Sequence, residues 1–155
     1  MAMGSERIAS LMPDILRNAS DTDASVEVRE GYLGLFVFLP NSMKDAFAPY
    51  VAQVLEVLLP GLADEAEPVR DVSYRASQVL VGQFGTSQTS LLLPPLEEGF
   101  FHGDWRIRQS SIQLMGTVIE NLLKEHRQFG ADLMSCEVLT KERRAFMLSS
   151  LYMVR

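Results

Sequence analysis

The fold is decided by the stretch Asp104-Trp105-Arg106-Ile107-Arg108-Gln109-Ser110-Ser111, whose pattern occurs three times in the chain. A turn-forming segment is followed by an aliphatic residue, an arginine and then a run of residues with helical apolar spacing. The other two copies are Glu27-Val28-Arg29-Glu30-Gly31-Tyr32 and Pro68-Val69-Arg70-Asp71-Val72-Ser73. The arginines recur about every 40 residues, a period that is typical of HEAT and armadillo repeats. The sequence therefore predicts an all-α solenoid.

The composition limits both the architecture and the function. The chain has 155 residues, of which 47% are hydrophobic and 22% charged, and these values are typical of a globular domain with its own core. The formal net charge is −6, which argues against general nucleic-acid binding, because phosphates are bound by clustered lysines and arginines. The single cysteine, Cys136, excludes an internal disulfide and fits a reducing, cytoplasmic compartment. No secretory signal or membrane-spanning run is visible, so no membrane partner is expected.

Apolar spacing divides the chain into three helix pairs and one further helix. We expect the pairs at about 5–39, 47–84 and 87–124, and the further helix at about 140–155. Pro40 is expected to end the second helix, and Pro94 and Pro95 to bend or interrupt the fifth. The polar residues 125–137 are interpreted as a loop, with a short helix within it as the alternative. Because the fourth unit lacks a second helix, residues 1–155 are expected to form one segment of a much larger solenoid.

The three repeated arginines are predicted to form a structural ladder. Arg29, Arg70 and Arg108 each lie in the first turn of a second helix, close to acidic turn residues such as Asp23 and Asp64. They could instead bind a ligand. However, a guanidinium can bond the carboxylates and carbonyls of its own turn and of the neighbouring turn together. The ladder would then join each repeat to the next.

Five other residues are the candidate partner-binding residues: Trp105, Arg106, Lys141, Arg143 and Arg144. Arg106 lies two residues before the ladder arginine of its helix, so it points to a different side. The other three cations crowd the first turn of the last predicted helix, where the helix dipole disfavours positive charge. Such placement against local preference indicates function, although a solvated helix face is the alternative. Trp105 either anchors a partner or covers the start of its own helix.

No pattern in the sequence indicates catalysis, a metal site or a cofactor site. His102 and His126 are the only histidines, and no third ligand stands at metal-binding spacing. Cys136 has no evident base beside it, and the acidic pairs lie at turns and exposed helix ends. The phosphate-binding loop, the nucleophile elbow and the zinc-protease motif are absent from the sequence. We therefore expect a protein that is not an enzyme.

Several motifs follow one another in the order found in one known family. They lie at residues 29–40, 61–65, 69–71, 91–94, 105–111, 142–144 and 151–153. In these motifs the chain resembles the large general control non-derepressible activators, which are very long HEAT-repeat scaffolds. The resemblance covers nearly the whole chain from about residue 26, and it is to the central region that is similar to elongation factor three. Residues 125–138 match no pattern of that family.

The resemblance implies a non-catalytic scaffold segment in a cytoplasmic translational activator. That family binds ribosomes and promotes phosphorylation of initiation factor two alpha by a kinase that responds to amino-acid starvation. The matching region is tied to the ribosome and to an ATP-binding-cassette partner, whereas the kinase is reached through other parts of the full-length protein. The alternative is a HEAT-repeat adaptor of another pathway, such as a transport or phosphatase scaffold. A small helical enzyme is a third, less supported reading.

Overall fold

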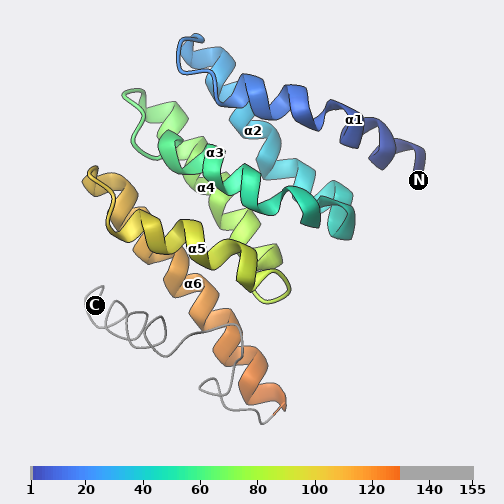
Figure 1. The fold of residues 1–155 in the computed structure, drawn as a ribbon, viewed down its shortest axis with the longest axis vertical. Helices are drawn as coiled ribbons and strands as arrows, with labels where there is room; N and C mark the ends of the chain where they lie inside the picture. Colours follow the sequence, from blue (N-terminus) through green and yellow to red (C-terminus); the bar gives the residue numbers. More distant parts are fainter. Residues whose placement is uncertain (1, 130–155) are drawn as a thin grey trace.

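The computed structural model describes residues 2–129, and all the regular elements in that range are helical (Figure 1). The helices are α1 (Ala2–Ala19), α2 (Val26–Met43), η1 (Lys44–Tyr50), α3 (Val51–Gly61), α4 (Glu67–Phe84), α5 (Thr89–Phe100) and α6 (Trp105–Phe129). Of these, η1 is a 3-10 helix that leads into α3. The predicted all-α solenoid is confirmed for this range. The further helix predicted at 140–155, with Lys141, Arg143 and Arg144, lies outside the described residues.

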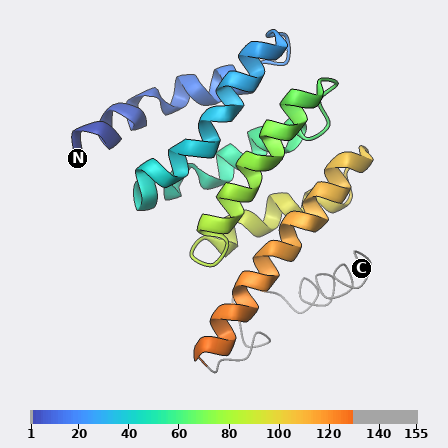
Figure 2. The ribbon, with the colours of Figure 1, turned by 180° about the vertical axis from the view of Figure 1, so that it is seen from behind.

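The helices form two layers, which Figures 1 and 2 show from opposite sides. Helices α1, α3 and α5 make one layer, and α2, α4 and α6 make the other. Within the second layer α2 packs on α4 and α4 packs on α6, and within the first layer α3 packs on both α1 and α5. The three turns that join the two helices of a pair lie along one edge (Figure 1). Repeated turn residues are therefore brought to the same edge of the molecule.

The core follows the register of the repeated arginines. The residues seven, eleven and fourteen positions after each arginine are buried in all three second helices, a spacing that places them on one helix face. They are Phe36, Pro40 and Met43 in α2, Ser77, Val81 and Phe84 in α4, and Met115, Ile119 and Leu122 in α6. Each repeat therefore contributes the same face to one continuous core, with Phe47 stacked on Phe84 at 5.8 Å between ring centroids.

The sequence prediction was wrong about where two helices end. Helix α2 does not stop at Pro40 but continues to Met43, with Pro40 buried inside it. The Pro40 carbonyl accepts hydrogen bonds from the Lys44 N–H and from Nε2 of Gln83 in α4, at 2.8 Å for the latter. This packing offsets the hydrogen bond that a proline cannot donate. Helix α6 also continues to Phe129, because residues 125–129 contain neither glycine nor proline and include good helix formers.

Helix α5 is one continuous helix through Pro94 and Pro95, which were expected to bend or interrupt it. The two prolines lie half-buried between Leu93 and Leu96, both of which are almost fully buried, so core packing holds the helix across them. No helix in residues 2–129 combines the length and the apolar content that crossing a membrane would require.

Candidate partner-binding site

The three ladder arginines bind carbonyl groups of the turns that precede their own helices. Nη1 of Arg70 and Nη1 of Arg108 each donate to the carbonyls five and six residues earlier, at 2.7–2.8 Å. Nη1 of Arg29 donates in the same way to Thr22 and Ala24, at 3.3 and 2.6 Å. Turn carbonyls have no partner within a helix, and a charged donor bonds them strongly. Each arginine thus fixes the turn of its own repeat.

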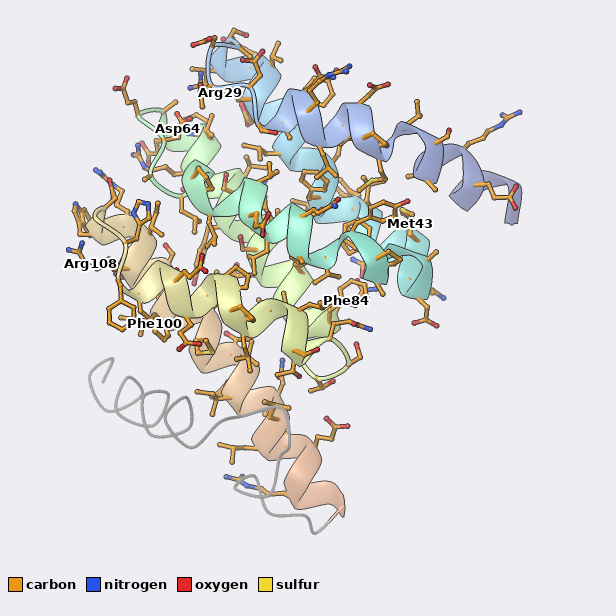
Figure 3. The ribbon with its side chains drawn as sticks, in the orientation of Figure 1. Arg29, Met43, Asp64, Phe84, Phe100 and Arg108 are labelled. Atoms are coloured by element: carbon orange, nitrogen blue, oxygen red, sulfur yellow. The ribbon has the colours of Figure 1, made fainter. Side chains whose placement is uncertain are left out.

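Arg29 also reaches the neighbouring repeat (Figure 3). Its Nη2 donates to Oδ1 of Asp64 at 2.9 Å, and each of the two side chains is 17% exposed. The same oxygen accepts the N–H of Ala66, also at 2.9 Å, so the carboxylate is held in place. A charge pair with so little solvent around it is stronger than an exposed pair. We propose that this pair, named the first-seam pair, joins the first repeat to the second.

His102 occupies in the third repeat the place that Asp64 occupies in the second. Both residues stand six positions before a ladder arginine, and the carbonyl of each accepts a bond from that arginine. His102 Nδ1 accepts the N–H of Asp104 at 3.0 Å, just as Asp64 accepts the N–H two residues later. An imidazole, however, offers Arg70 no carboxylate. The carboxylate that joins Arg29 to the next repeat therefore has no equivalent at His102.

Replacing His102 by aspartate is expected to supply the missing pair. The new carboxylate could accept both the Asp104 N–H and the guanidinium of Arg70, as Asp64 does for Ala66 and Arg29. Because His102 is exposed, the free energy of unfolding should rise by only about 0.5–1 kcal/mol, which corresponds to at most a few degrees in melting temperature. His102→Asn is the control, because asparagine keeps the acceptor for the backbone without the charge. Equal melting temperatures for the two variants would contradict the assignment.

A groove lies between the N-terminal ends of α4 and α6, with a volume of about 240 Å³. One wall is formed by Arg70, Asp71 and Tyr74 of α4, and Leu62 closes one side. The other wall is formed by α6, and its lining residues are Trp105, Arg106, Gln109, Ser110 and Gln113. Helix α6 starts here because the Asp104 carboxylate accepts the Arg106 N–H at 2.7 Å. We refer to this feature as the α4–α6 groove.

Trp105 and Arg106, both predicted from the sequence as partner-binding residues, lie together in this groove. Trp105 is 56% exposed, and the guanidinium carbon of Arg106 lies 4.9 Å from the centroid of its ring. At this distance the cation is attracted to the ring face and holds the tryptophan in position. The sequence prediction did not include Arg70 and Tyr74 in this site. Their spacing of four residues, which places them on one face of α4, was the available signal.

Titratable side chains in the described residues do not form a metal site. No group of three or more histidine, cysteine, aspartate or glutamate residues in residues 2–129 could hold a metal ion. The pKa of Glu27 is lowered by a hydrogen bond from its own backbone N–H and, to a smaller extent, by one from Ser25. Glu27 lies at the start of α2 and does not line the α4–α6 groove. Cys136 lies outside the described residues.

Comparison with known proteins places this architecture in a family. Residues 5–133, which contain the ladder and the α4–α6 groove, match the model for the EF3 N-terminal HEAT repeat. The chain belongs to this family. Because the EF3 N-terminal HEAT repeat match extends over all three helix pairs, the arginine register and the groove are both parts of a HEAT-repeat array.

Several curated proteins resemble the chain over nearly its whole length. It is 37% identical to the stalled ribosome sensor GCN1 of Homo sapiens and 34% identical to the eIF-2-alpha kinase activator GCN1 of Saccharomyces cerevisiae. It is 39% identical to protein ILITYHIA of Arabidopsis thaliana. Each comparison covers 99% of the chain but only 6% of the relative, so the chain spans a small part of these proteins. No solved structure matches the chain significantly.

Proposed function

We propose that the chain is a scaffold segment of a ribosome-associated translational activator that promotes phosphorylation of initiation factor two alpha during amino-acid starvation. The observation that carries this proposal is the similarity over 99% of the chain to proteins named as a stalled ribosome sensor and as an eIF-2-alpha kinase activator. The architecture supports it, because stacked helix pairs present long binding surfaces. The proposed protein is cytoplasmic and non-catalytic. Its partners are the ribosome, an ATP-binding-cassette protein and, through other parts of the full-length protein, the kinase.

We propose further that the described repeats are one segment of a longer solenoid. In α4 and α6 the residue before the arginine is buried, with Val69 fully covered and Ile107 4% exposed. The equivalent residue of α2, Val28, is 44% exposed, and Phe38 on the same helix is 70% exposed. Helix α4 is covered on this side by α2, whereas α2 has no such neighbour within the described residues. Another repeat stacked on α2 would bury this apolar surface.

The ribosome-contacting surface is proposed to be the set of cations that stand outside the ladder. The chain has a net charge of −6, so its average field repels RNA, and binding requires a local basic cluster. Arg106 lies in the α4–α6 groove beside the exposed ring of Trp105. Lys141, Arg143 and Arg144 are the other members of the proposed cluster on the basis of the sequence.

Charge reversal tests this proposal. In the intact protein, the combined substitutions Arg106→Glu, Arg143→Glu and Arg144→Glu should partly reduce co-sedimentation with ribosomes while helicity by circular dichroism stays unchanged. The affinity should also depend less on salt, since each lost phosphate contact removes nearly one unit from the slope of log K against log salt. Reversal of Arg17, an exposed cation on α1, is the matched control.

Two outcomes would count against the proposal. A triple variant that sediments like the unchanged protein, with the same salt slope, would show that these cations are only solvated. Failure of the unchanged protein to sediment with ribosomes would favour the other reading, a HEAT-repeat adaptor of a different pathway.

A further inference from the structure

We propose that the α4–α6 groove binds a segment of single-stranded RNA, with phosphates on Arg70 and Arg106 and a base stacked on Trp105. The inference rests on the proposed ribosome association, which would bring such RNA to the protein, and it specifies the ligand class at this site. Three properties of the groove carry it: its charge, its aromatic surface and its amide side chains.

The charge of the groove is opposite in sign to that of the whole chain. Its lining carries two guanidinium groups, from Arg70 and Arg106, and one carboxylate, from Asp71. The described hydrogen bonds of Arg70 all use Nη1, which donates to two carbonyls of its own turn. That contact fixes the guanidinium before any ligand arrives, so little side-chain freedom is lost on binding. The groove is thus a small, pre-organised positive site in a chain of net charge −6.

The aromatic surface suits an unpaired base better than a duplex. Trp105 is 56% exposed, and Arg106 covers one face of its ring from 4.9 Å. A base can stack on exposed indole, and an arginine beside the ring adds a contact to the same base or to its phosphate. Bases inside a duplex are already stacked and cannot enter a groove of about 240 Å³. The ligand is therefore expected to be single-stranded.

The remaining side chains of α6 can contact the base edge. Gln109 and Gln113 lie one helical turn apart in the lining, and each amide carries both a donor and an acceptor. Such groups can bond any base, so we expect weak sequence preference. A basic protein segment is the competing ligand, because Asp71 would attract its lysines and arginines. The two ligands predict opposite effects of removing the Asp71 charge.

The test measures fluorescence anisotropy of a 5′-labelled 12-nucleotide oligouridylate titrated with the intact protein. Trp105→Ala should weaken binding about tenfold, and Trp105→Phe should retain most of it because a ring remains to stack. Arg106→Glu should weaken binding by a similar factor and lower the salt slope by roughly 0.7, the value for one phosphate contact on a single strand. The matched control is Arg75→Glu, which reverses an exposed arginine of α4 outside the groove lining and should leave the affinity nearly unchanged.

The substitution Asp71→Asn distinguishes the two ligand classes, because it should strengthen RNA binding but weaken the binding of a basic protein segment. RNA should bind this variant about two- to threefold more tightly, because a repelling carboxylate is removed. Weaker oligouridylate binding by Asp71→Asn, or equal affinities for Trp105→Ala, Arg106→Glu and Arg75→Glu, would overturn the proposal. Circular dichroism of each variant measures its helicity, so that a loss of binding can be distinguished from a loss of folding.

Ribosome sedimentation, run in parallel, keeps the two proposals distinguishable. If the unchanged protein sediments with ribosomes but does not bind the oligouridylate through Trp105, the RNA inference fails and the scaffold function stands. If it binds the oligouridylate through Trp105 but does not sediment with ribosomes, the groove assignment stands and the scaffold function fails.

Discussion

Replacing Arg29 by alanine is expected to lower the free energy of unfolding by about 2–4 kcal/mol. The substitution removes the only charge partner that Asp64, whose side chain is 17% exposed, has among residues 2–129. It also removes the donor to the carbonyls of Thr22 and Ala24. The cost is large because the Asp64 carboxylate would remain largely buried, with the Ala66 N–H as its remaining donor in the described part of the chain. Urea denaturation followed by circular dichroism measures the change.

The matched control for Arg29 is Arg17, which also forms an arginine–aspartate pair. Arg17 and Asp14 lie 2.7 Å apart, but their side chains are 75% and 60% exposed, so Arg17→Ala should cost less than about 0.5 kcal/mol. A double-mutant cycle of Arg29→Ala with Asp64→Ala isolates the energy of the first-seam pair. If Arg29→Ala and Arg17→Ala shift stability equally, burial adds nothing to the pair and the proposed structural role is wrong.

Replacing Gly99 by alanine should destabilise the protein by about 1–3 kcal/mol, although alanine is normally the better helix former. A Cβ at this position of α5 would lie 2.0 Å from Oγ and 2.8 Å from Cβ of Ser111 in α6. The equivalent Gly61 of α3 meets Ser73 of α4 in the same way, at 2.2 and 3.1 Å. The two helices of each of these pairs therefore approach so closely that only glycine fits. Thermal melting measures the loss.

Two further variants make the glycine prediction specific. Gly82 lies on an exposed side of α4, and no described atom stands within 4 Å of the place its Cβ would take, so Gly82→Ala should stabilise the protein by about 1 kcal/mol. Ser73→Ala should largely rescue Gly61→Ala, because the remaining Cβ contact of 3.1 Å needs only a small adjustment. The Ser73 hydroxyl is buried without a hydrogen-bond partner among the described residues, so its removal costs little by itself. A stabilising Gly99→Ala would show that the helices can separate freely.

Local sequence patterns predict most of the architecture but fewer of the residues that form the candidate site. The arginine register and the apolar spacing predicted the three helix pairs, because each pair is specified by about 40 neighbouring residues. Pro40 does not end α2, although its sequence context predicts that it would. The helix continues because Pro40 is buried against α4 and its carbonyl accepts a hydrogen bond from Gln83, 43 residues away. Short-range preference cannot include such a contact. The polar composition of residues 125–129 favours a loop, but α6 continues through them because they contain neither glycine nor proline.

In the candidate site, too, some residues can be predicted from their sequence neighbours, whereas others depend on contacts between distant helices. Trp105 and Arg106 are neighbours in the sequence, and their unusual placement at a helix start could be recognised there. The contribution of Arg70 and Tyr74 depends on how α4 lies against α6, which no local pattern contains. The role of His102 in its turn becomes visible only when the arginine register aligns this residue with Asp64.

The different residues at the two seams give the array joints of unequal stiffness. The first joint carries the pair between Arg29 of α2 and Asp64 in the turn before α4, and this pair opposes displacement of the first repeat against the second. The second joint has His102 where the first has Asp64, and the hydrophobic core, whose packing has no preferred direction, continues across it. We therefore expect bending of the array to be easier at the second joint than at the first. The α4–α6 groove lies at that second joint, between the helices that such bending would displace.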